Sequence, residues 1–126
     1  MNQTAECQSN ECRYVPGYHD TDGSSLQSFL QCSYDDLVKV LGHPQVDALV
    51  DDEADYKTSS EWIVFDRMTG SVFTVYDYKA TGVYESGLPT VESFRKRASY
   101  DWHIGGRTNA RAFIFWLKNR IALQCK

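Results

Sequence analysis

A short stretch near the C-terminus, WHIGGRTNAR, combines residue types that suit the binding of a small anion. Two adjacent glycines let a ligand approach the backbone closely, and free N–H groups at the start of a following helix attract negative charge. Two arginines, one helical turn apart, add positive charge. The candidate ligand-binding residues are Trp102, His103, Gly105, Gly106, Arg107 and Arg111. The ligand that fits this chemistry is a nucleotide or another small phosphate, bound at a Gly-Gly turn before the C-terminal helix.

The same glycine pair is also what a sharp turn from a strand into a helix needs. Its spacing matches neither the G-x-G-x-x-G of dinucleotide-binding folds nor the G-x-x-x-x-G-K-S/T of phosphate loops. The stretch therefore has two interpretations, a phosphate site and a structural hinge, and the spacing favours the hinge.

No pattern in the chain singles out a catalytic group. The three histidines, His19, His43 and His103, stand outside the H-E-x-x-H, G-x-S-x-G and C-x-x-C motifs. Carboxylates on the predicted strands offer a two-carboxylate site as a further alternative, but such side chains are more often solvated or paired with Arg and Lys. We favour a protein that is not an enzyme, with no catalytic residues and no cofactor.

The four cysteines are too few and too scattered for a secreted disulfide framework. Zinc needs four ligands, and Cys7, Cys12 and His19 leave the set one short unless Cys32 folds back. We therefore expect free thiols and no bound metal. The first residues lack the basic and apolar segments of a secretory signal, and no apolar run is long enough to span a bilayer. These features predict a cytoplasmic or nuclear protein without membrane contact.

Charge is unevenly distributed along the chain. The net charge is -4, yet residues 1–79 hold 14 acidic and 5 basic side chains, while residues 80–126 hold 3 acidic and 8 basic ones. Affinity for a duplex grows with the number of phosphates neutralised, so an acidic chain is poorly suited to an extended nucleic acid. The basic C-terminal part still suits a single phosphate group.

Residues 34–41 predict a short helix near the middle of the N-terminal half. Ser33 and Asp36 stand in the positions of a capping box, and Gly42 followed by Pro44 ends the helix. The polar, aperiodic residues 1–25 predict an irregular, flexible N-terminal arm, which leaves residues 26–126 as a single domain. Within that domain, the segment LQSFL is either a helical turn or a docking segment.

Two β-rich segments, EWIVFDR and SVFTVYDYK, predict an antiparallel hairpin that turns at Gly70. The segment YDWHI alternates as a half-buried strand does, with Gly105 and Gly106 ending it. Residues 80–98 between these strands predict a long loop. A closing helix follows, capped by Thr108 or Asn109 and running to about Leu123.

The closing helix carries an apolar stripe and one aromatic residue outside it. Ala110, Phe113, Ile114, Leu117 and Ile121 form the stripe at helical spacing. Phe115 projects instead among the basic side chains, and Trp116 flanks the stripe. We predict an interface made by Phe115, Trp116 and Lys118, covered by a partner, by a second copy or by the N-terminal arm; the remaining alternative is a ring that is simply exposed. In a dimer, Arg111 and Lys118 would reach the acidic residues 51–55 of the neighbour.

Together these elements predict an α+β fold, with a small antiparallel sheet of about three strands packed by two helices. The expected core residues are Trp62, Val64, Val75, Trp102, Ile104, Phe113 and Leu117.

Three sequence blocks occur in order: an E-W pair, a G-x-V-x-T-x-Y-D-Y-K-like strand (here GSVFTVYDYK) and a W-x-I-G-G turn, preceded by the helix YDDLVKVLG. In these blocks the chain resembles a group of small uncharacterised proteins of bacteriophages and large DNA viruses, over roughly residues 34–122. The resemblance implies a viral accessory protein of the host cytoplasm or nucleus and carries no catalytic residues. We expect a non-enzymatic binding protein that contacts a host or viral protein, or forms a homodimer. The alternative function is binding of a small phosphate ligand.

Overall fold

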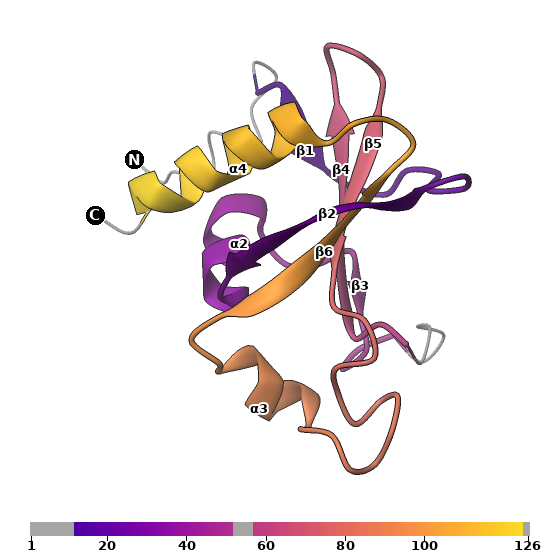
Figure 1. Ribbon diagram of the computed structural model, residues 1–126, viewed down its shortest axis with the longest axis vertical. Coiled ribbons are helices and arrows are strands. Elements are labelled where there is room, and N and C mark those ends of the chain that lie inside the picture. Colours follow the sequence, from indigo (N-terminus) through magenta and orange to yellow (C-terminus); the bar gives the residue numbers. More distant parts are fainter. Residues whose placement is uncertain (1–11, 52–56, 125–126) are drawn as a thin grey trace.

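The computed structural model describes residues 12–51 and 57–124. These residues form one antiparallel sheet with helices packed against one face (Figure 1). The strands are β1 (Tyr14–Pro16), β2 (Ser25–Cys32), β3 (Val46–Asp47), β4 (Ser60–Asp66), β5 (Val72–Tyr76) and β6 (Tyr100–Gly106). The helices are α2 (Tyr34–Leu41), α3 (Val91–Arg95) and α4 (Arg111–Gln124). The predicted α+β class is confirmed.

The predicted sheet of about three strands with two helices is wrong, because the described part holds six strands and three helices. The strands order as β1-β4-β5-β6-β2, and β3 also pairs with β4. The prediction missed β1 and β3 because each has at most three residues. It missed β2 because the first five residues of that strand are all exposed, so no apolar alternation marks them. The segment LQSFL is therefore a strand rather than a helical turn.

The described part of the N-terminal segment contains regular structure. β1 pairs with β4 at one end of the sheet, and β2 pairs with β6 at the other. Residues 17–24 must therefore cross the sheet between the two strands, and His19 stacks on Phe65 along this path with 4.6 Å between ring centroids. The irregular arm predicted for residues 1–25 is thus corrected for residues 14–16 and 25, while residues 1–11 lie outside the described part.

The predicted core is confirmed. Its seven residues, Trp62, Val64, Val75, Trp102, Ile104, Phe113 and Leu117, are each 0% exposed. The short helix also has its predicted bounds, because the Ser33 hydroxyl accepts the Asp36 N–H and the Asp36 carboxylate accepts the Ser33 N–H. Gly70 turns the β4–β5 hairpin at a φ of 79°, as its position predicts.

The Gly-Gly turn is displaced from its predicted place. β6 continues through Gly106, and both glycines pair with β5 on one side and β2 on the other. A Cβ on Gly105 would lie 2.5 Å from Thr74 Oγ1, and a Cβ on Gly106 would lie 2.8 Å from Phe73 Cδ1. The glycines therefore make room for side chains of the neighbouring strand, and residues 107–110 make the connection to α4.

The predicted loop of residues 80–98 also contains regular structure. α3 begins after Thr90, whose hydroxyl accepts the Ser93 N–H, and its Phe94 packs edge-on against Trp102. Of the helices in the described part, none is long and apolar enough to cross a membrane.

Candidate functional site

A groove of about 400 Å³ separates α4 from the start of β2. It is lined by Gln27, Ser28, Asn109, Ala110, Arg111, Ile114, Phe115 and Lys118. Its two walls therefore come from segments that lie some eighty residues apart in the chain. Three of the predicted site residues, Arg111, Phe115 and Lys118, lie on this one surface.

The rotation of α4 decides which side chains face the groove. The helix starts where the Asn109 side chain accepts the Arg111 N–H at 2.8 Å, one of the two caps that the sequence offers. Phe113 and Leu117 point into the core and are fully buried, and the Phe113 ring stacks on Phe73 with centroids 5.1 Å apart. This orientation leaves Phe115 68% exposed on the groove side.

The other wall of the groove is the strand at the end of the sheet. Among the described residues, β2 pairs only with β6, so its outer edge carries backbone groups without a strand partner. The sequence of β2, SLQSFLQC, contains no charged residue, and its Leu26 and Phe29 are 49% and 51% exposed. An edge strand that is long, uncharged and partly apolar is a template for pairing with another chain.

Positive charge flanks the exposed ring. Arg111 and Lys118 are both exposed and line the groove on either side of Phe115. Within residues 12–51 and 57–124, neither of the two forms an ion pair. The groove therefore presents an apolar centre between two available cations, which suits an acidic, partly apolar occupant.

The other predicted site residues lie elsewhere. Trp102 is in the core, where its indole N–H donates to the Cys32 carbonyl at 3.0 Å. Arg107 donates to the Asp20 carbonyl at 2.8 Å and so holds the segment that crosses the sheet. Trp116 packs against Tyr14 with centroids 4.9 Å apart, on the side of α4 away from the groove. The part of the N-terminal segment that is described therefore covers Trp116 and not Phe115.

His103 lies on the face of the sheet opposite the core tryptophans. Its ring contacts Phe29, Tyr76 and Tyr78, with centroids 4.9, 5.3 and 5.6 Å away. Burial lowers the pKa of the imidazole from 6.5, against the opposing effect of the Asp77 charge. Its Nδ1 is buried and has no hydrogen-bond partner among the described residues. The predicted ligand set thus spreads over both faces of the sheet, and the phosphate site stays a prediction.

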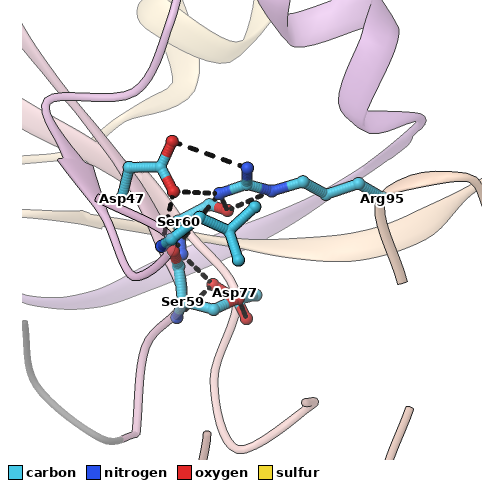
Figure 2. A network of polar contacts seen from close by, with 6 residues as sticks. Asp47, Ser59, Ser60, Asp77 and Arg95 are labelled. Atoms are coloured by element: carbon cyan, nitrogen blue, oxygen red, sulfur yellow. Dashed lines mark hydrogen bonds and ion pairs between the residues drawn. The ribbon is translucent and has the colours of Figure 1, made fainter. Parts of the chain in front are cut away.

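A partly buried polar network ties α3 to the sheet (Figure 2). Arg95 donates to Asp47 and to the Ser60 hydroxyl, each at 2.8 Å. Asp77 accepts three hydrogen bonds, from the Ser59 hydroxyl and from the N–H groups of Ser59 and Ser60. Burial raises the pKa of Asp77, although these donors oppose the rise. Because every charged group here is satisfied internally, we assign the network a structural role.

Acid should weaken this network because it protonates the Asp47 carboxylate that pairs with Arg95. Burial alone would raise the pKa of Asp47, but hydrogen bonds from Arg95 and the Leu49 N–H lower it below the ordinary 3.8. The pKa of Asp47 is thus lower in the folded state than in the unfolded state. The Asp47 carboxylate therefore stabilises the fold fully above pH 3.8, and this stabilisation is lost as the pH falls through the folded-state pKa. Denaturant unfolding across acidic pH should show a weaker pH dependence for Asp47→Asn than for the wild type. An unchanged dependence in Asp47→Asn would contradict the ion pair.

The sequence offers LQSFL as a docking segment, one of two alternatives, but it does not indicate that Gln27 and Ser28 face α4 across a groove. The available signal was the absence of charge from residues 23–34, between Asp22 and Asp35, in a chain that is 24% charged. In the portion of the chain that the structure describes, no three His, Cys, Asp or Glu side chains gather as metal ligands. Cys7, which belongs to the weighed zinc set, lies outside that portion.

The described residues form an α+β fold in which helices cover one face of the sheet and a basic, aromatic groove lies beside the unpaired edge of β2. No family model matches the chain, and no curated protein matches it.

Proposed function

We propose that the protein is a non-enzymatic binding module that acts through protein–protein contacts at the groove between α4 and β2. The observation that carries the proposal is Phe115, which stands 68% exposed between two cations and beside an uncharged strand edge. The resemblance to small viral proteins adds to this proposal the role of a viral accessory factor in the host cytoplasm or nucleus, with a host or viral protein as partner.

The energetics of the groove support a protein partner. Complete burial of a phenylalanine side chain is worth about 1.5–3 kcal/mol, so covering Phe115 would contribute a large share of a moderate affinity. Aromatic and arginine side chains dominate binding hot spots when partners bury them. Exposed main-chain groups along β2 add hydrogen bonds that do not depend on the sequence of the partner.

A peptide selection tests whether this surface is the preferred docking site. We expect peptides selected from a random display library to bind the wild type and to protect β2 and α4 from amide hydrogen exchange. Phe115→Glu should weaken their binding at least about tenfold, because the ring that they cover becomes a charge.

The control for this test is Met68→Glu, which places the same charge at an exposed apolar residue of the β4–β5 turn. It should bind the selected peptides as the wild type does. Selected peptides that protect another surface, or that bind Phe115→Glu undiminished, would overturn the groove as the docking site.

A further inference from the structure

We infer that the occupant of this groove is a second copy of the chain, and that the two copies pair their β2 strands in antiparallel fashion about a two-fold axis. The inference rests on the proposed function and names its partner. The pairing would join two sheets into one continuous sheet and set the start of α2 of each copy beside the groove of the other.

The two ends of the sheet differ in how well they are protected. At the β4 side, β1 has three residues, ends at Pro16 and shares β4 with the two-residue β3. Short strands and proline are the usual means by which proteins blunt an edge. At the other side, β2 has eight residues and contains no proline, glycine or charge. Among the strands of the described residues, β2 alone therefore offers a length of edge that another strand can follow.

The regular part of β2 suits pairing. The register with β6 shifts between Leu26 and Ser28, so a bulge interrupts the strand near Gln27. From Ser28 to Cys32 each residue pairs in sequence with β6, which leaves five consecutive residues in regular geometry. A matching segment from a second copy would satisfy the outer backbone groups of this stretch, and would cover Phe29 on one face of the sheet.

The distribution of charge favours the antiparallel, two-fold arrangement. Arg111 lines the groove beside Gln27 and Ser28, at the start of β2. Asp35 is exposed in the first turn of α2, just beyond the end of β2. Antiparallel pairing brings the start of one strand to the end of the other, so the cations of each copy meet the acidic turn of its neighbour.

The helices support the same geometry. α2 and α4 contribute to one core cluster on one face of the sheet, through residues such as Leu37, Val40, Phe113 and Leu117. A two-fold axis perpendicular to the sheet keeps the helix faces of both copies on the same side. Packing two α4 helices directly against each other would instead bring Arg111 and Lys118 toward the same residues of the neighbour, which like-charge repulsion disfavours.

Sedimentation velocity on the full chain, from micromolar to millimolar concentration, tests the association. We expect a monomer–dimer equilibrium, with alternate amides of residues 28–32 gaining protection from hydrogen exchange as the dimer forms. A chain that stays monomeric throughout the range would overturn the inference, and so would a dimer in which β2 gains no protection.

A charge swap tests the contact between Asp35 and the cations. Arg111→Glu and Asp35→Lys should each weaken the dimer about tenfold, because each replaces an attraction with a repulsion across the interface. The double variant should regain most of the loss, since it reverses both partners. Lys96→Glu, the same charge change at the exposed C-cap residue that follows α3, serves as the control and should leave the dissociation constant unchanged. Melting curves establish that each variant is folded.

Failure of the inference and failure of the proposed function give different results. If the single variants weaken the dimer and the double variant does not recover, the antiparallel arrangement is overturned. If the chain is monomeric but selected peptides still protect β2 and α4, the second copy is overturned and a foreign partner takes its place. If those peptides protect another surface, the proposed function fails as well.

Discussion

Replacing Leu117 by alanine should lower the free energy of unfolding by about 2–5 kcal/mol, whereas replacing Phe115 should change it little. Leu117 is fully buried in the cluster that joins α4 to the sheet, and truncation there leaves a cavity as well as losing burial. Phe115 lies two positions earlier on the same helix and is 68% exposed. Denaturant unfolding of Leu117→Ala, Phe115→Ala and the wild type measures both effects.

The pair of variants also tests the rotation of α4, on which the groove depends. A loss below about 0.5 kcal/mol for Leu117→Ala, within the range of surface substitutions, would mean that this residue is not buried. A large loss for Phe115→Ala would mean that its ring is covered within the monomer. If Phe115→Ala leaves the free energy of unfolding nearly unchanged, weaker binding by Phe115→Glu reflects a change at the binding surface and not a loss of folding.

The helix α2 and the β4–β5 hairpin were predictable because local interactions specify them. The capping box at Ser33 and Asp36 determines where the helix starts, and Gly70 supplies the positive φ of the turn. The core stripe of α4 was predictable for a similar reason, since Phe113 and Leu117 follow the helical period. In each case the residues that carry the signal are within a few positions of one another.

β2 was not predictable from local pattern. Its pairing with β6 joins Leu30 to Trp102, more than seventy residues later in the chain. At the end of the sheet, side chains on both faces of its first five positions meet solvent, so burial imposes no alternation on them. Three residues of the groove, Arg111, Phe115 and Lys118, were predictable from the helix, while the strand that completes the groove required the tertiary structure.

Gly105 and Gly106 were predicted to form a turn, but they lie in strand β6. A glycine pair before a helix predicts a turn because glycine accepts backbone conformations that other residues resist. Here neither glycine has the positive φ that such a turn uses. Both lie in a paired strand, where the missing Cβ admits Thr74 and Phe73 from β5. Sequence alone does not distinguish a glycine that bends the chain from one that leaves space for a neighbour.

Gly106→Ala should therefore destabilise the fold by about 1–3 kcal/mol, the usual cost of adding atoms to a packed site. The new Cβ would lie 2.8 Å from Cδ1 of Phe73, whose ring stacks on Phe113 at an interplanar angle of 5°. Phe73 must move to relieve this clash, and its movement would disturb the packing of α4 against the sheet. Denaturant unfolding measures the loss, and hydrogen exchange should show increased opening in α4.

Gly87→Ala is the matched control, because nothing lies within 4 Å of a Cβ at that position. It should be neutral or slightly stabilising, since alanine restricts the unfolded chain more than glycine does. If the contact with Phe73 causes the loss, Phe73→Leu should cost less in the Gly106→Ala background than in the wild type, because the smaller side chain relieves the clash. If the losses of Phe73→Leu and Gly106→Ala instead simply add in the double variant, the loss in Gly106→Ala comes from the backbone. The inference that Gly106 leaves space for the Phe73 ring would then be wrong.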